Sequence, residues 1–287
     1  MENYIILTDS SCDMPEELVK ECEIDVCQLD VTLDGEDSCP NNKLDIPFFY
    51  AALRAKRGAK TNAVPIGEFI DIIEKYAKNG TDVLYIGFSS GLSATFNNGR
   101  AACAELSEKY PERKLIAVDS LCASLGQGLL VYYAAKMKKD GATIEETADF
   151  VTNERLHLCH QFTVDDLFFL HRGGRVSAAT AVVGSALGIK PVLHVDNEGH
   201  LINIGKARGR KASIVALFDA MKRTAITDKY KTVFISHGDC EVEAKLLADM
   251  VENEFHPDRI VINYVGPVIG AHSGPGTIAL FYYGSER

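Results

Sequence analysis

Five hydroxyl-bearing or glycine residues lie close together in one turn of the chain: Gly87, Ser89, Ser90, Gly91 and Ser93. They follow a short apolar run at 83–86 that is typical of a strand, and a helical pattern starts near Ala94. A helix that begins after such a turn offers unpaired backbone N–H groups and the positive end of its dipole, so an anionic group is stabilised there. The turn therefore predicts an anion-binding site, or else a turn whose serines only cap the helix.

The same turn also fits a different chemistry, that of a serine esterase. The sequence GFSSG at 87–91 matches G-x-S-x-G, the nucleophile elbow that lies between a strand and a helix. Acidic residues and His272 follow downstream, which gives the order serine, acid, histidine. This alternative needs an exposed Ser89, a base within hydrogen-bond reach and an oxyanion hole, and no HGGG-type segment precedes the turn.

Three further groups of polar residues are candidates for binding. His272 lies among glycines and prolines at 266–276, where a tightly fixed backbone can hold an imidazole against a ligand or leave it in solvent. The densest basic grouping of the chain comprises Arg172, Arg175, Lys206, Arg208, Arg210 and Lys211. Such a grouping is either a solvated face or a docking face for an acidic partner or a phosphate. The segment HLCH at 157–160 has no second ligand cluster at zinc spacing, so it predicts a helix end and no metal site.

The elements that position these residues alternate between strands and helices in the first half of the chain. Apolar strands are predicted at 4–7, 24–33, 83–86 and 115–118. Helices separate them, which favours a mainly parallel sheet. Three of the strands end in turns that carry Asp or Ser: Thr8-Asp9-Ser10-Ser11, Ser89-Ser90 and Asp119-Ser120. Because ligands of parallel sheets lie at the carboxyl ends of the strands, we expect these turns to gather at one edge.

The pattern changes after about residue 160. A hairpin is predicted from 192–195 and 201–204, and helices and strands follow up to a final strand at 277–283. A run of small apolar residues at 177–187 predicts a helix that either packs closely or leaves room for the wall of a tunnel. The sequence thus predicts an α/β protein of two domains. Residues 1–160 are expected to form a mainly parallel sheet flanked by helices, and residues 161–287 a mixed α/β domain.

Composition and charge exclude several classes of function. The 287-residue chain is 46% hydrophobic and has a net charge of −10, which is poorly suited to binding nucleic acid. No apolar run approaches the roughly 20 residues that span a membrane, and we recognise no signal peptide. The eight cysteines are scattered without a C-x-x-C pair, which predicts reduced thiols in a cytoplasmic protein. Neither GAKT at 58–61 nor GQG at 126–128 completes a nucleotide-binding motif, so neither ATP nor another cofactor is expected.

Five segments occur together and in order, and their combination resembles one known family. They are Thr8-Asp9-Ser10-Ser11, Ser89-Ser90-Gly91-Leu92-Ser93, Val118-Asp119-Ser120, Arg172-Gly173-Gly174-Arg175 and the loop 266–276. Over essentially its whole length the chain resembles the DegV family, the bacterial fatty-acid-binding proteins that serve as FakB subunits of fatty acid kinase. The loop GPVIGAHSGPG and the turn SSGLSATF are the most specific parts of this resemblance.

The resemblance implies a lipid-binding carrier and not an enzyme. A long-chain fatty acid would lie in a buried apolar tunnel, with its carboxylate held by Thr61 of the extended loop 60–65, Ser93 and His272. Three neighbours are expected to support these contacts: Asn62, Ser90 and Gly91. A separate ATP-binding kinase subunit would phosphorylate the bound carboxylate to acyl phosphate. The residues expected to dock this partner are Arg172, Arg175 and Arg208.

Overall fold

The first part of the chain builds a parallel sheet. The computed structural model describes residues 3–178 and 188–287. Four parallel strands lie in the order β2 (Asp25–Cys27), β1 (Tyr4–Asp9), β6 (Asp82–Gly87) and β7 (Leu115–Asp119). The predicted parallel sheet is confirmed, and the carboxyl ends of β1, β6 and β7 meet at one edge, as expected from their shared direction.

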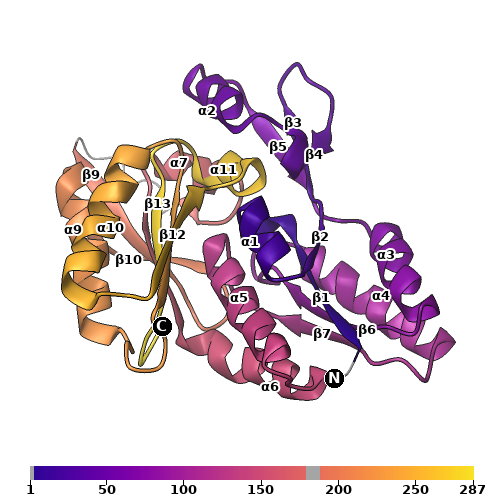
Figure 1. Cartoon of the computed structure of the whole chain (residues 1–287). Coiled ribbons are helices and arrows are strands. Elements are labelled where there is room, and N and C mark those ends of the chain that lie inside the picture. The colour runs from indigo at the N-terminus through magenta and orange to yellow at the C-terminus, as the bar shows by residue number, and fades with distance from the viewer. Residues whose placement is uncertain (1–2, 179–187) are drawn as a thin grey trace.

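Helices cover both faces of this sheet (Figure 1). On one side lie α3 (Ile66–Lys78) and α4 (Thr95–Lys109), which contact each other and β6. On the other side lie α5 (Leu125–Lys139) and α6 (Ile144–Glu154), and α6 begins with a capping box formed by Thr143 and Glu146. The short helices here are α1 (Glu16–Glu21) and the 3-10 turns at Ser10–Cys12, Asn41–Lys43 and Arg155–His157.

A small antiparallel sheet projects from the first part of the chain, with α2 (Ile46–Arg54) beside it (Figure 1). Its strands lie in the order β4 (Cys39–Pro40), β3 (Asp30–Leu33) and β5 (Ala59–Asn62). The single strand predicted at 24–33 is therefore wrong, because β2 and β3 belong to different sheets. The two strands are separated at Leu29, whose N–H donates to Ser10 Oγ at 2.9 Å and not to a neighbouring strand.

The later part of the chain forms a second large sheet with helices packed against it, which confirms the predicted mixed α/β character. Its strands lie in the order β10 (Leu201–Arg208), β9 (Ile189–Val195), β8 (Leu158–Thr163), β13 (Ile278–Tyr283), β11 (Thr232–His237) and β12 (Arg259–Tyr264). Among the described strand pairs of this sheet, β11 and β12 run parallel and the others run antiparallel. The residue that we chose as the domain boundary, 160, lies inside β8, and the division into two domains stays a prediction.

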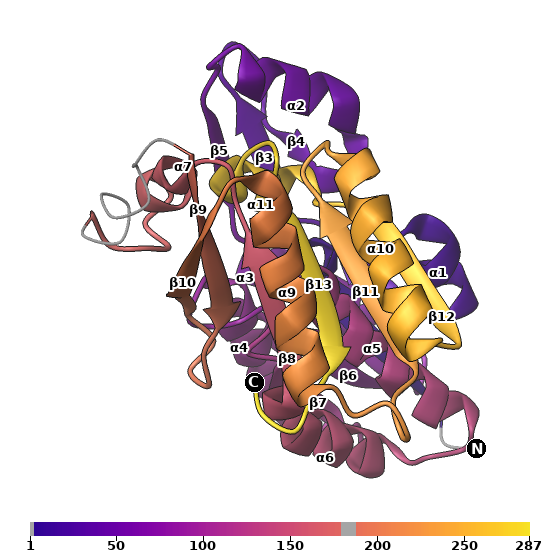
Figure 2. The ribbon, with the colours of Figure 1, turned by 90° about the vertical axis from the view of Figure 1, so that its left-hand side faces the viewer.

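Helices α9 (Arg210–Thr224) and α10 (Glu241–Phe255) cover the outer face of the mixed sheet (Figure 2). On its inner face, α5 contacts β8, β11 and β13 as well as β1, so this helix is a layer shared by the two large sheets. The helix α7 (Leu167–Arg172) lies beside α11 (Pro267–Ser273) at one end. The helix predicted at 177–187 falls almost wholly outside the described residues.

Two local predictions are wrong for identifiable reasons. The segment 266–276, predicted as a loop, contains α11, which has Pro267 in its first turn and is followed by Gly274 with a φ of 77°. Proline at a helix start and a left-handed glycine after a helix end are ordinary boundary signals. The segment 157–160, predicted as a helix end, leads into β8, and its His160 is buried in the sheet.

Within residues 3–178 and 188–287, none of the helices combines the length and the apolar character needed to cross a membrane.

Candidate functional site

A cavity of about 300 Å³ lies where the edge of the parallel sheet faces the inner side of the mixed sheet. Phe88 and Leu92, which follow β6, line one side of it. Phe162 of β8 and Ala279 and Phe281 of β13 line the other side. Ligand pockets commonly have volumes of ~300–1,000 Å³ and mostly apolar walls, so the cavity is of a size to enclose a small molecule.

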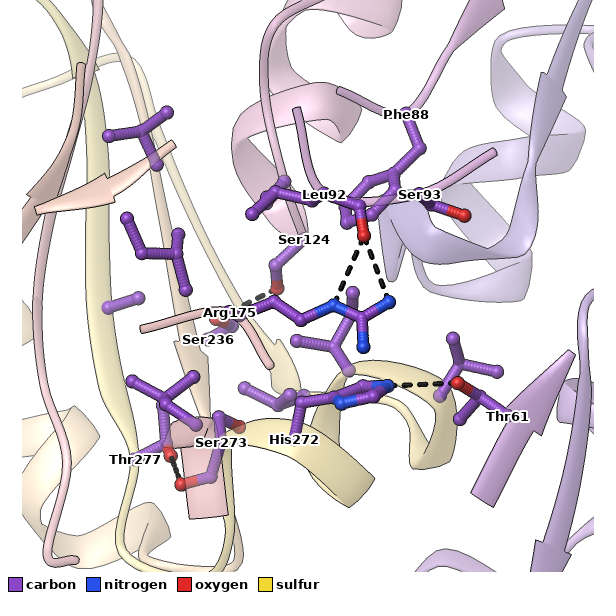
Figure 3. Close-up of a pocket in the computed structure, with 18 of the residues that line it drawn as sticks. Thr61, Phe88, Leu92, Ser93, Ser124, Arg175, Ser236, His272, Ser273 and Thr277 are labelled. Atoms are coloured by element: carbon purple, nitrogen blue, oxygen red, sulfur yellow. Dashed lines mark hydrogen bonds between the residues drawn. The ribbon is translucent and has the colours of Figure 1, made fainter. Parts of the chain in front are cut away.

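Four polar side chains meet at one end of this cavity (Figure 3). The hydroxyl of Thr61 and Nε2 of His272 are 2.8 Å apart and form a hydrogen bond. Arg175 extends between His272 and the turn after β6, where its Nε and Nη2 donate to the Leu92 carbonyl at 3.1 and 3.0 Å. Ser93 lines the cavity next to this carbonyl. Strand β5, α11 and the turn before α4 thus bring together residues far apart in sequence.

The imidazole of His272 is poised as a neutral hydrogen-bonding group. Burial, and next the positive charge of Arg175, lower its pKa from 6.5 to about 4. Among the residues that the structure describes, its Nδ1 has no hydrogen-bond partner. A Cβ added to Gly173 would collide with this nitrogen, so the glycine allows the close approach of the ring. A bound anion beside the ring would favour the protonated form and raise this pKa.

Ser93 both begins a helix and lines the cavity, two roles that the sequence alone offers as alternatives. Its Oγ accepts a hydrogen bond from the Thr95 N–H at 3.2 Å and lies 2.9 Å from the Thr95 hydroxyl, so it helps to begin α4. The residue also lines the cavity and remains partly exposed. A hydroxyl accepts and donates at once, so capping leaves its proton free to turn toward a ligand.

A second polar group lies in the cavity wall and was not predicted. Ser124, just before α5, lies 3.2 Å from the Ser236 hydroxyl (Figure 3). Its hydroxyl also donates to the Asp13 carboxylate at 2.5 Å. Asp13 also accepts the Gly266 N–H at 3.0 Å, so it joins the first turn of the chain to α5 and to the segment before α11. Burial raises the pKa of Asp13 to about 7. The run of small residues at 123–128 was the available sequence signal for this group.

The supporting residues predicted around the head group divide between the cavity and the surface. Asn62 lines the cavity beside Thr61. Ser90 and Gly91 do not line it: the Ser90 N–H donates to Asp119 at 3.2 Å, and Gly91 packs against the backbone of the β9–β10 turn. Their roles are therefore to shape the turn that presents Ser93.

The three arginines expected to dock a partner also lie in different places. Arg175 lines the cavity and is half-buried. Arg172 is exposed on α7 and stacks over the Phe169 ring, with its guanidinium carbon 4.5 Å from the ring centroid. Arg208 is exposed at the end of β10. Only Arg172 and Arg208 thus present a charge on the outside.

The esterase alternative finds no support in these contacts. Ser89 is fully buried, and its hydroxyl donates to the Gly199 carbonyl at 2.8 Å. The ring of His272 instead bonds to Thr61, so the pair that an esterase needs is not assembled. Ser89 serves to fix the turn, since its Oγ also accepts the Gly91 N–H at 3.2 Å.

The acidic side chains in the turns at the sheet edge likewise hold the backbone of these turns in place. The Asp9 carboxylate accepts the Phe88 N–H at 2.9 Å and the Tyr85 hydroxyl at 3.0 Å. Burial raises the pKa of Asp9 above its ordinary value. The predicted gathering of the three turns is confirmed, and the contacts show that their carboxylates hold the turns together. Across the described part of the chain, no group of three His, Cys, Asp or Glu side chains is arranged to hold a metal ion.

The fold and cavity define a class of α/β proteins whose two large sheets enclose a largely apolar pocket with one polar end. The family model described as "Uncharacterised protein, DegV family" matches residues 3–285. The chain belongs to the DegV family.

Relatives of known sequence and structure agree over the whole length. A DegV domain-containing protein of Clostridium perfringens is 42% identical over 289 residues, which cover 100% of this chain and 99% of the relative. A DegV lipid binding protein of Thermotoga maritima is 29% identical, with a TM-score of 0.85 and full coverage of both chains. DegV from Bacillus subtilis, a fatty acid binding protein, is 28% identical, with a TM-score of 0.85 and 98% and 99% coverage.

Proposed function

We propose that this chain binds a long-chain fatty acid in the cavity and presents its carboxylate to a separate ATP-binding kinase subunit, which phosphorylates it to acyl phosphate. The observation that carries the proposal is the hydrogen-bonded pair of Thr61 and His272 at the polar end of an otherwise largely apolar cavity. The lipid and fatty acid binding of the relatives from Thermotoga maritima and Bacillus subtilis supports the ligand class.

The apolar walls supply most of the affinity. A fatty acid of about 16 carbons has about 14 methylene groups, and burial of each contributes about 0.8 kcal/mol, or roughly 11 kcal/mol in total. A free fatty acid in a cell gains similar burial in a membrane, so the protein competes only if it encloses most of the chain. The largely apolar lining between the two large sheets is suited to that requirement.

The polar end sets the orientation. If His272 Nε2–H donates to Thr61 Oγ1, the Thr61 proton is left for the ligand, and Ser93 supplies a second hydroxyl donor. Each charge-assisted hydrogen bond contributes about 1.5–3 kcal/mol, and desolvation of the anion offsets much of that gain. The positive charge of Arg175 close by further favours an anion at this end.

Phosphorylation requires a partner, because the sequence contains no complete nucleotide-binding motif. The exposed Arg172 and Arg208 are proposed to dock the acidic surface of that partner, and Arg175 is proposed to act at the ligand end of the cavity. The carrier is proposed to work in the cytoplasm, where such a kinase has access to ATP. Charge reversal at Arg208 that leaves coupling to the kinase unchanged would remove the docking role.

The test combines lipid occupancy with phosphorylation. The double variant Thr61→Ala with Ser93→Ala is purified beside the wild type, extracted for bound fatty acid, and incubated with the kinase subunit and ATP. We expect lower fatty acid occupancy or lower acyl phosphate formation, with thermal unfolding unchanged within a few degrees. A double variant that carries and presents lipid like the wild type would show that the head-group site is assigned wrongly.

A further inference from the structure

The inner face of the mixed sheet presents its side chains to the cavity in rows. In the antiparallel register of β13 and β8, Ala279 lies opposite Phe162, and Phe281 lies opposite His160. All four of these residues line the cavity. On the neighbouring pair of strands, Leu201 lies opposite Val195, and both line it as well.

The cavity ends at the row formed by His160 and Phe281. The next pair in the register, Leu158 opposite Tyr283, is fully buried and does not line the cavity. The imidazole of His160 also lies directly against α5, because a Cβ added to Gly126 of that helix would collide with the ring. This row is therefore the closed end on the side of the mixed sheet.

The closed end is far from the polar end. Thr277, just before β13, donates to the Ser273 carbonyl at 3.1 Å and so lies against the last turn of α11, which carries His272. Phe281 lies four positions further along the chain, and a strand advances about 3.3 Å per residue, so the row lies roughly 13 Å beyond Thr277. An acyl chain whose carboxylate binds near His272 would point its methyl end toward this row.

His160 presents an apolar edge although it is a histidine. Its Nε2 accepts the Ala123 N–H at 3.2 Å, so the ring proton lies on Nδ1, which donates to the Leu158 carbonyl at 3.1 Å. Burial, and next the charge of Arg287, lower the pKa of His160 well below 6.5, which keeps the ring neutral. Both nitrogens are satisfied by the backbone, so only ring carbons remain to contact a ligand.

The same contacts make His160 rigid. Its ring meets that of Phe281 edge-on, with centroids 5.3 Å apart. Arg287 donates to the Leu158 carbonyl at 3.2 Å, the same oxygen that His160 uses, and also bonds to the Leu121 carbonyl. The ring is thus fixed between β8 and the segment that leads into α5, and it cannot swing aside to admit a longer chain without breaking these bonds.

We infer that His160, backed by Phe281, is the residue that stops the methyl end of the bound acyl chain and so sets the longest fatty acid that this protein accepts. This inference rests on the proposed function and identifies a specificity-determining residue for it. The limit on chain length is then imposed by a residue of the mixed sheet that lies far along the sequence from the head-group residues.

Three variants test this inference, and for each we expect a shift of the bound fatty acids in a given direction of chain length. His160→Ala leaves a cavity at the closed end and is expected to shift the bound fatty acids toward longer chains by about two carbons. His160→Asn is expected to shift them in the same direction and keeps an acceptor for the Ala123 N–H if alanine prevents folding. Ala279→Leu fills the row nearer the polar end and is expected to shift them toward shorter chains.

The matched control is His194→Ala. His194 lies on β9 directly opposite Gln161, the residue that follows His160 on β8. The side chain of His194 does not line the cavity. Each protein is extracted and its fatty acids are identified by mass spectrometry, and dissociation constants are measured for saturated fatty acids of increasing length. The control is expected to keep the wild-type distribution.

The possible results are distinguishable. A wild-type protein that neither carries nor binds any fatty acid would contradict the proposed function itself. A wild type that binds fatty acid, together with folded variants at His160 that keep its chain-length distribution, would overturn the inference and leave the proposed function standing. A shift toward longer chains in His160→Ala or His160→Asn, but not in His194→Ala, would support it.

Discussion

Thr61→Val is the sharpest perturbation of the polar end, because valine keeps the shape of threonine and removes only the hydroxyl. In the structure this hydroxyl is 2.8 Å from His272 Nε2 and lies in the cavity wall. The substitution should therefore remove one hydrogen bond to a bound carboxylate and leave the apolar walls unchanged. Thr32→Val is the matched control, because Thr32 lies on the adjacent strand β3, opposite Lys60, and does not line the cavity.

The size of the effect follows from the charge of the ligand. A hydrogen bond to a charged group contributes about 1.5–3 kcal/mol, and each 1.4 kcal/mol is a factor of about ten in the dissociation constant. We expect Thr61→Val to weaken fatty acid binding by about 10- to 100-fold. The methyl ester of the same fatty acid keeps the chain and loses the charge, so its affinity should change much less.

The assay is competitive displacement of a fluorescent fatty acid, by the free acid and by its methyl ester in parallel, for the wild type, Thr61→Val and Thr32→Val. Thermal unfolding of each protein checks that the fold is kept. If Thr61→Val weakens binding of the ester as much as binding of the acid, the hydroxyl acts on packing and not on the carboxylate. Equal affinity of the wild type and Thr61→Val for the acid would likewise show that the Thr61 hydroxyl does not bind the carboxylate.

Three further predictions concern other groups around the cavity. Gly173→Ala should displace the His272 ring and weaken binding of the acid, whereas Gly67→Ala, where a Cβ meets no neighbour, should have no effect in the same titration. Because burial raises the pKa of Asp13 from 3.8 to about 7, the folded protein binds more protons than the unfolded chain between these values, and the free energy of unfolding should fall as pH rises across them. Urea unfolding of Asp13→Asn should show a weaker fall, and an unchanged slope would contradict the role of that carboxyl. Finally, a fluorophosphonate should not label the buried Ser89, and labelling that disappears in Ser89→Ala would revive the esterase alternative.

Much of the parallel sheet was predictable because its signals are local. The apolar run of β6, the turn at 87–93 and the start of α4 are adjacent in sequence, and strand direction alone brings the carboxyl ends of β1, β6 and β7 together. Hydrogen bonds from Phe88 to Asp9 and from Ser90 to Asp119 confirm that expectation. The apolar alternation of β9 and β10 predicted their hairpin in the same way.

The predictions that were wrong concern residues whose positions depend on contacts between distant segments. A continuous apolar alternation at 24–33 does not reveal that β3 pairs with β5 in another sheet. His160 looked like part of a helix end because its partners, the Ala123 N–H and the Phe281 ring, are remote in sequence. Arg175 looked like one member of a basic surface grouping, and only the tertiary fold places it in the cavity beside His272.

The head-group assignment came from the family resemblance and not from local pattern. The fold brings Thr61, Ser93 and His272 to one cavity, and no spacing rule connects three residues on a strand, a turn and a short helix. Their contacts with a ligand remain a proposal. The pair formed by Ser124 and Asp13 was not predicted, because neither residue stands out in the sequence by itself. Only the fold brings the two side chains together, in a hydrogen bond of 2.5 Å.

Mass spectrometry of the purified protein, first under native conditions and then after organic extraction, is the most direct test of fatty acid binding by this chain. We expect a stoichiometric mass excess over the bare chain, and an extract in which that mass is a long-chain fatty acid. Protein that has its bare mass and still binds no fatty acid when the acid is added back would contradict it.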